Sequence, residues 1–438
     1  MQNNFQIHIN KNLSFLKESK FLIAISGGID SVVLAYLCKN LNLNFSLAHC
    51  NFNLRAEESN KDEDFVLELA EALDVEIFIQ NFDTQAYADE NKRSIQMAAR
   101  ELRYDWFKEL AQQLKFDYIL TAHHADDNLE TFLINFTRGT GLNGLTGIPV
   151  KNDNVVRPLL PFSRVQIEAY ATKENIIWRE DASNASRKYL RNKLRHEVVP
   201  ILKEINPQLL ESFQSTTSYL NDTADIVEES LRAVKKRAIV NSDKTGVTYK
   251  VSEFKKVKNS KAYLFEMFKN YGFTQWDDIV DLLDAESGKQ IRSNTHRLVK
   301  HREFLILADL PELDLENVSI FINETDYHIE TPIGQLTFTS ESVISETSKN
   351  VIYVDKDTLK FPLELRLWKE GDVFYPSGMT GKKKVSKYLK DEKLSLIEKE
   401  NIWLLASNDK VVWIVGMRND ERFKITEATN NILKIEYK

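Results

Sequence analysis

Short apolar runs alternate with amphipathic stretches along the first third of the chain. The run Phe21–Ile25 is wholly apolar and predicts a buried strand. Further strands are expected at 45–48, 75–79 and 118–122, and helices at 32–38, 59–73, 94–114 and 125–136. This alternation is typical of a parallel, doubly wound α/β sheet, in which ligands bind beyond the carboxyl ends of the strands.

The pattern changes after Pro207. The stretches 209–240 and 261–283 have helical spacing, whereas β-rich segments such as 363–368 and 411–415 dominate from Asn317 onward. We therefore expect three domains: an α/β domain over 1–210, a helical domain over 211–310 and a β-rich domain over 311–438.

The composition is that of a soluble globular protein. Of the 438 residues, 42% are hydrophobic and 28% charged, and no apolar run reaches the roughly 20 residues that a membrane helix needs. Residues 1–12 lack the apolar core of a signal peptide. The cysteines, Cys38 and Cys50, do not form a CxxC pair, so neither a disulfide scaffold nor an iron–sulfur site is expected, and a reducing cytoplasm fits.

The net charge of −7 and the pI of about 5.8 disfavour a nucleic-acid partner, because phosphate groups bind Lys and Arg. The charge is unevenly distributed, however. Residues 57–76 are acidic, whereas 187–196 and 382–387 are basic. Local patches decide binding more than the total charge does, so a nucleic-acid partner stays open.

A glycine-containing loop connects the first predicted strand to the first helix. Its sequence is Ser26-Gly27-Gly28-Ile29-Asp30-Ser31. Glycine lets the backbone approach a phosphate closely, and the free N–H groups at a helix start favour an anion. The alternative is a plain tight turn in which Ser and Asp cap the helix. No GxxxxGK[ST] is present, which excludes the Walker loop of γ-phosphate kinases.

The hexapeptide matches the SGGxDS signature of PP-loop ATP pyrophosphatases, and further segments resemble the tRNA(Ile)-lysidine synthetases within that superfamily. These segments are 49–55, 99–104, 121–131, 138–142, 157–160, 178–181, 191–195, 371–372 and 378–385. The resemblance covers nearly the whole chain, although 210–350 contains no recognised motif. Ala56 departs from the glycine that the family often has there.

The resemblance implies a cytoplasmic ATP-dependent carbon–nitrogen ligase that forms AMP. ATP adenylates the 2-position oxygen of the wobble cytosine in an isoleucine tRNA with a CAU anticodon. The amine of free L-lysine then displaces AMP, and the modified base reads AUA. The implied cofactors are ATP and Mg²⁺, and the implied partners are this tRNA and lysine, with no membrane; a homodimer is an open alternative to a monomer. The first domain would be catalytic, and the other two would bind tRNA.

Carboxylates near the phosphate loop are the first candidates for catalysis. Asp30 is a candidate magnesium ligand, because a carboxylate beside phosphate oxygens usually holds that ion, or else it caps the helix. Asp127 and Glu130 share a helix face and are candidates for binding the ammonium groups of lysine or deprotonating its amine. A solvated acidic helix start is the alternative. His123, four positions before Asp127, leaves a metal site open.

Basic residues supply the remaining candidates. Arg191 and Arg195, with Lys188 on the same face, are candidates to stabilise charge on the adenylated base or to hold anticodon phosphates. The alternative is an ordinary basic helix face. Further candidates for tRNA contacts are Arg100, Arg103 and Arg138, for which a structural ion pair is the alternative. His49 is a candidate for nucleotide binding, or else a satisfied histidine at a strand end. The last candidates for tRNA contacts are Lys382, Lys383, Lys384 and Lys387, with a solvated charge run as the alternative.

Two other functions compete with this interpretation. A PP-loop tRNA thiolase usually needs cysteines poised for sulfur transfer, whereas Cys38 and Cys50 lie within or beside core elements. A non-catalytic regulator that binds adenine nucleotides would leave the Asp127/Glu130 pair and the basic patches without a purpose.

The strand–loop–helix arrangement generates a first prediction. Asp30→Ala should abolish release of AMP and pyrophosphate, because the variant lacks the carboxylate expected to hold magnesium beside the phosphates. Pyrophosphate release measures the activity, and circular dichroism checks that the fold is intact. Parental turnover in a folded Asp30→Ala protein would remove Asp30 from the site.

Overall fold

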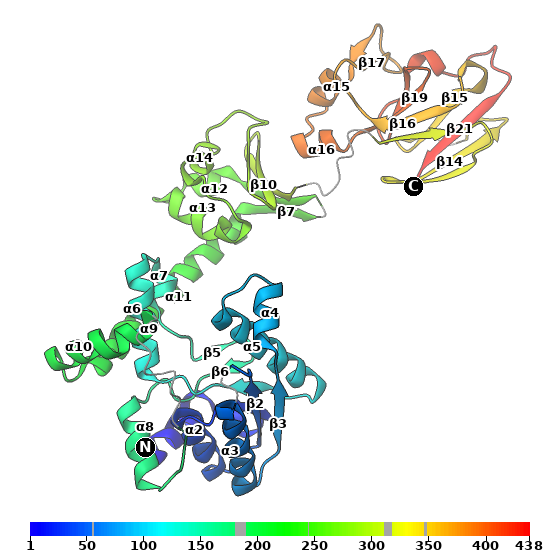
Figure 1. The fold of residues 1–438 in the computed structure, drawn as a ribbon. Coiled ribbons are helices and arrows are strands. Elements are labelled where there is room, and N and C mark those ends of the chain that lie inside the picture. The colour runs from blue at the N-terminus through cyan, green and yellow to red at the C-terminus, as the bar shows by residue number, and fades with distance from the viewer. Residues whose placement is uncertain (55–56, 180–189, 244, 311–317, 346–347) are drawn as a thin grey trace. The chain divides into compact units, whose positions relative to one another are not determined.

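The computed structural model describes residues 1–54, 57–179, 190–243, 245–310, 318–345 and 348–438. Contacts divide the chain into two compact units, Met1–Glu228 and Glu229–Lys438. The long helix α11, Leu209–Ala238, contributes residues to both units (Figure 1). No helix within the described ranges is long and apolar enough to cross a membrane.

The first unit is built on a six-stranded sheet of order β3-β2-β1-β4-β6-β5. Its strands are β1 Phe21–Ala24, β2 Phe45–Asn51, β3 Ile77–Asn81, β4 Tyr118–Leu120, β5 Lys151–Asn152 and β6 Val155–Val156. All neighbours are parallel except β5 and β6. The prediction of a parallel, doubly wound sheet is therefore confirmed, and the short antiparallel edge is an addition to it.

Helices cover both faces of this sheet (Figure 1). Their bounds are α1 Gln2–Asn12, α2 Ile29–Asn40, α3 Glu57–Leu73, α4 Thr84–Glu90, α5 Ile95–Gln113, α6 Ala125–Arg138, α7 Leu142–Leu145, α8 Arg164–Lys173, α9 Leu190–Lys193 and α10 Val199–Ile205. Phe21 and Ile23 pack in one core with α1, α2, α3 and α8, whereas Leu22 packs in a second core with α5. Because side chains alternate along a strand, the wholly apolar β1 fills both cores.

The β1 register fixes where the loops of this unit meet. Phe21 lies opposite Phe45 of β2 and Tyr118 of β4, so the carboxyl ends of the three strands share one edge of the sheet. The phosphate loop leaves β1 and the start of α6 follows β4 at this edge. The topology therefore brings together two segments that lie about a hundred residues apart in the sequence.

The second unit begins with a five-stranded antiparallel sheet of order β7-β8-β11-β10-β9. Its strands are β7 Ile239–Asp243, β8 Gly246–Lys250, β9 Gln290–Arg292, β10 His296–His301 and β11 Phe304–Asp309. Helices α12 Val251–Lys255, α13 Ser260–Phe268 and α14 Trp276–Asp281 share one core with this sheet.

The expectation of a helical domain over 211–310 therefore needs correction. It holds for α11, but the stretch 261–283 is broken because Gly272 adopts a left-handed conformation with φ 76°. Beyond it, β10 and β11 form a hairpin whose turn contains Arg302 at φ 54°. Arg297 and Lys300 within β10 are buried, so this strand lacks the apolar–polar alternation by which a strand is identified in the sequence.

The last part of the second unit contains two four-stranded antiparallel sheets, β12-β16-β19-β20 and β13-β14-β21-β15, around a shared apolar core. The strands are β12 Ser319–Ile322, β13 His328–Thr331, β14 Gly334–Glu341, β15 Val351–Asp355, β16 Leu363–Leu367, β19 Trp403–Ser407, β20 Lys410–Ile414 and β21 Ile432–Tyr437. The short pair β17 Val373–Phe374 and β18 Lys383–Lys384 precedes α15 Val385–Asp391, and α16 is Leu396–Glu400. The β-rich end of the chain is thus confirmed.

Candidate functional site

The phosphate loop is held by hydrogen bonds between its own residues. Ser31 Oγ donates to Gly28 O at 2.9 Å and accepts from the Ser26 N–H at 3.2 Å. Gly27 has φ 84°, and a Cβ there would lie 3.3 Å from the Phe65 ring, so a side chain is disfavoured twice. Gly28 is the N-cap of α2 and no side chain caps that helix. The capping alternative for Ser26 and Asp30 therefore does not describe the loop.

The start of α6 carries three carboxylates that are largely withdrawn from water. His124 is the N-cap, and its imidazole and the Asp127 carboxylate form a reciprocal capping box with the backbone. The side chains of Asp126, Asp127 and Glu130 are 10%, 15% and 1% exposed. A solvated acidic helix start does not fit these values, so the carboxylates need cationic partners.

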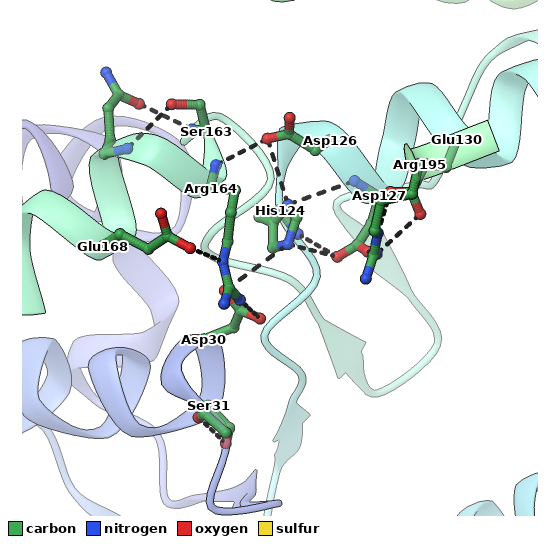
Figure 2. A network of polar contacts seen from close by, with 12 residues as sticks. Asp30, Ser31, His124, Asp126, Asp127, Glu130, Ser163, Arg164, Glu168 and Arg195 are labelled. Atoms are coloured by element: carbon green, nitrogen blue, oxygen red, sulfur yellow. Dashed lines mark hydrogen bonds and ion pairs between the residues drawn. The ribbon is translucent and has the colours of Figure 1, made fainter. Parts of the chain in front are cut away.

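Arg195 supplies that partner for two of the carboxylates (Figure 2). Its Nε donates to Glu130 Oε1 at 2.6 Å, and its Nη2 donates to Glu130 Oε2 at 2.9 Å and to Asp127 Oδ1 at 3.0 Å. Arg191 donates to Thr131 Oγ1 at 2.6 Å and places its Nε 3.6 Å from Glu130 Oε2. Burial raises the pKa of Glu130 although Arg195 opposes the shift. One guanidinium thus bridges both carboxylates of the predicted lysine site.

Asp30 lies beside this cluster, and its two carboxylate oxygens have different surroundings. Its Oδ2 accepts from Arg164 Nη1 at 2.6 Å, whereas its Oδ1 lies 3.8 Å from His124 Nε2 (Figure 2). Oδ1 is buried and has no hydrogen-bond partner within the described part of the chain. Burial raises the pKa of Asp30, while His124 and Arg164 oppose the shift. An unpaired buried acceptor costs about 1–3 kcal/mol, so this oxygen suits a cation that arrives with the ligand.

Asp30 Oδ1 is the observation that fits a magnesium ion, which prefers oxygen ligands and few of them from protein. No group of three or more His, Cys, Asp or Glu side chains with metal-binding geometry occurs among the residues that the structure describes. A metal site formed by His123 with Asp127 therefore has no support in these residues.

His123 is buried near several charged side chains, most of them arginines. Burial lowers its pKa to about 4, Asp127 opposes the shift, and Arg157, Arg191 and Arg100 add to it. Its Nδ1 lies 2.9 Å from Thr121 Oγ1. The imidazole is therefore neutral at physiological pH and surrounded by positive charge.

Other predicted residues lie outside this cluster of ion pairs. His49 is buried, with Nδ1 2.9 Å from Ile25 O, which is the satisfied strand-end histidine given as its alternative. Arg100 stacks over Tyr104 and Arg103 over Phe52, with centroid distances of 4.8 and 5.1 Å. Arg138 is exposed at the end of α6. Arg55, Ala56, 180–181, Arg187 and Lys188 lie outside the described residues.

The predicted lysine cluster belongs to the second unit. Lys382, Lys384 and Lys387 are exposed. Lys383 differs, because its Nζ forms a 2.8 Å ion pair with Asp391 and lies over the Tyr388 ring. Three of the four lysines are therefore available to a partner in the way that the sequence suggested.

Several residues of the site escaped the sequence analysis. Arg164 and Lys203 pair with Asp30 and Asp126 across 134 and 77 positions of the sequence. No local spacing marks such pairs, although Ser163 and Gln166 form a capping box that signals the helix start before Arg164. Arg157 lay within a recognised motif but had no assigned role.

Known protein families match most of the chain. Residues 1–202 match the family described as PP-loop domain, 242–310 the TilS substrate binding domain and 363–437 the TilS substrate C-terminal domain. The tRNA(Ile)-lysidine synthase of Parabacteroides distasonis is 40% identical over 441 residues, covering 100% of both chains. That of Bacteroides thetaiotaomicron is 37% identical and covers 97% of both. Among solved structures, the U34-tRNA thiolase NcsA from Methanococcus maripaludis is 18% identical, with a TM-score of 0.42, over 50% of this chain and 78% of its own.

Proposed function

This chain belongs to the tRNA(Ile)-lysidine synthase family, and we propose that its phosphate loop and the acidic start of α6 carry the two chemical steps of that activity. The protein is an ATP-dependent ligase that modifies tRNA(Ile), since full-length relatives and family-specific domain matches agree. The observation that carries the residue assignment is the Arg195 bridge between Asp127 and Glu130, beside Asp30.

In the first step, the loop 26–31 and the N–H groups at the start of α2 hold the phosphates of ATP. The 2-position oxygen of the wobble cytosine attacks the α-phosphorus, and pyrophosphate leaves. Asp30 would hold a magnesium ion through Oδ1, the unpaired acceptor. Magnesium supplies charge neutralisation on the phosphates.

In the second step, Asp127 and Glu130 bind an ammonium group of lysine and orient the attacking amine. They are suited to this because both are close to Arg195 and therefore already arranged around one cation. The amine must lose a proton before it attacks carbon 2 of the cytosine, and a carboxylate in this pair accepts it. The bond between carbon 2 and the oxygen attached to phosphorus then breaks, and AMP leaves with that oxygen.

Arg191 and Arg195 act on the negative charge that develops in both steps. Arg191 has a buried Nε without a hydrogen-bond partner among the described residues, so it has a donor left for a ligand. Guanidinium groups are suited to the phosphate oxygens of the leaving pyrophosphate and AMP, on which this charge develops. The neutral His123 is available as a hydrogen-bonding group rather than as a cation.

The thiolase alternative gains no support from the cysteines. Burial raises the pKa of the Cys50 thiol to about 12 and that of Cys38 still further from its ordinary value. Sulfur transfer needs a thiolate, which such thiols do not form at physiological pH.

Three further expectations stay predictions: the division into domains 1–210, 211–310 and 311–438, the cytoplasmic location and the homodimer. The molar mass of the protein in solution tests whether it is a homodimer.

Lysine ligation tests this proposal directly. The protein, ATP, labelled lysine and tRNA(Ile) with a CAU anticodon are incubated together, and label in RNA is compared with AMP. One lysine should enter the RNA for each AMP formed. Glu130→Gln should reduce lysine transfer by about 10–100-fold, the loss expected for a charge-assisted hydrogen bond, while pyrophosphate release is affected less.

Glu211→Gln, at an exposed carboxylate on α11, is the matched control and should behave as the parent. An unchanged lysine KM and transfer rate in Glu130→Gln would exclude Glu130 from the lysine site. AMP formation without label in RNA would contradict the ligase assignment itself.

The exposed lysines in and just before α15 are proposed to bind phosphate groups of the tRNA. Replacing Lys382, Lys384 and Lys387 with Ala should weaken tRNA binding and lower the slope of log affinity against log salt by up to about 0.7–0.9 per lost phosphate contact. ATP binding should not change. Filter binding at several salt concentrations measures both quantities.

The matched control replaces three exposed lysines elsewhere in the second unit, Lys349, Lys410 and Lys438, with Ala. It removes the same charge, so it separates a local contact from a general charge effect. If both triple variants have the same salt slope, this cluster does not contact the tRNA.

A further inference from the structure

Arg164 contacts the phosphate loop through Asp30, but it has no role in the two chemical steps proposed above. Its Nη1 donates to Asp30 Oδ2 at 2.6 Å, and its Nε donates to Glu168 Oε1 at 2.7 Å (Figure 2). Two carboxylates from two helices therefore fix one guanidinium, whose planar fork loses little freedom on binding. The side chain is only 38% exposed.

The position of Arg164 is determined by its backbone as well. It is the first residue of α8, after a capping box formed by Ser163 and Gln166. Its N–H donates to Asp126 Oδ2 at 2.8 Å, and Asp126 Oδ1 accepts from Lys203 at 2.5 Å. The start of α8 is thus attached to the start of α6, and the side chain reaches from there to α2. Arg164 connects the carboxylate of the phosphate loop to the acidic helix.

The contact with Arg164 makes the two carboxylate oxygens of Asp30 unequal. Oδ2 is occupied by the guanidinium, whereas the buried Oδ1 lacks a hydrogen-bond partner in the described ranges. A free carboxylate would rotate to satisfy both oxygens or turn to water. Arg164 prevents this, and a buried acceptor stays available. Carboxylates that bind metals are commonly oriented by such a hydrogen bond to their second oxygen.

We propose that Arg164 is a positioning residue that holds Asp30 by Oδ2 and thereby presents Oδ1 to the magnesium ion of the bound nucleotide. This inference rests on the proposed role of Asp30. The proposal predicts that loss of the Arg164 side chain changes metal affinity in the direction opposite to that expected from charge alone. A guanidinium near a cation repels it, so charge removal alone should tighten metal binding. Loss of a positioning contact should weaken it.

Manganese binding distinguishes the two, because Mn²⁺ replaces Mg²⁺ and is observed by electron paramagnetic resonance without any turnover. The full-length protein is titrated with Mn²⁺ in the presence of a non-hydrolysable ATP analogue. Arg164→Gln should bind Mn²⁺ about 10-fold more weakly, at the lower end of the effect of such orienting contacts. Arg164→Lys keeps a donor for Oδ2 and should recover part of the affinity. The magnesium concentration for half-maximal pyrophosphate release should follow the same order.

Lys173→Gln is the matched control. Lys173 lies at the other end of α8 with its side chain 80% exposed, so this variant removes a positive charge and should bind Mn²⁺ as the parent does. Glu168→Gln keeps the Asp30 contact but replaces the charged second acceptor of Arg164 with a neutral one, so it should weaken Mn²⁺ binding by a smaller factor. It also keeps the test decisive if Arg164→Gln does not fold.

The inference is overturned if Arg164→Gln binds Mn²⁺ as tightly as the parent or more tightly. If Arg164→Gln does not fold, it is overturned if both Glu168→Gln and Arg164→Lys bind Mn²⁺ as the parent does. Asp30→Asn separates this from a failure of the proposed function. If Asp30→Asn binds Mn²⁺ as the parent does, Asp30 is not the metal ligand. If Asp30→Asn loses affinity and the Arg164 variants do not, only the positioning role is excluded.

Discussion

The site depends on the burial of negative charge at the start of α6. Glu130 is 1% exposed, and removing a carboxylate from water is unfavourable unless a cation and hydrogen bonds compensate it. Three cations do so here: Arg195 for Asp127 and Glu130, Lys203 for Asp126, and Arg164 for Asp30 nearby. Each comes from a segment that follows the sheet in the sequence, so compensation of this buried charge requires that these later segments pack against α2 and α6.

The need to compensate this buried charge explains why the phosphate loop and the carboxylates proposed to bind lysine form one structural unit. The parallel strands β1 and β4 bring the loop and α6 to the same edge of the sheet, and α8 then contacts both. In the proposed mechanism, a cationic substrate near Asp127 competes with Arg195, and Arg164 orients Asp30 for a metal ion. Internal cations thus order these acidic side chains, and we propose that positively charged ligands take over part of that role during the reaction.

The sequence predicted those parts of the fold and site that depend on neighbours in the chain. The apolar run 21–25, the glycines after it and the i,i+3 pair Asp127/Glu130 are local signals, and each was identified correctly as an element or a cluster. Arg164 and Lys203 were missed because their partners lie far away in sequence. The broken stretch 261–283 was misread because one left-handed glycine, Gly272, outweighs an otherwise helical pattern. The residue roles themselves stay proposals.

The central claim is that Glu130 and Arg195 act as one charge unit in lysine transfer. A double-mutant cycle of Glu130→Gln and Arg195→Gln, measured as the rate of lysine transfer to adenylated tRNA, tests it most directly. We expect strong coupling, on the order of 1 kcal/mol or more, with the double variant hardly slower than the poorer single variant. Losses that simply multiply would show that the two side chains act independently and would contradict the account.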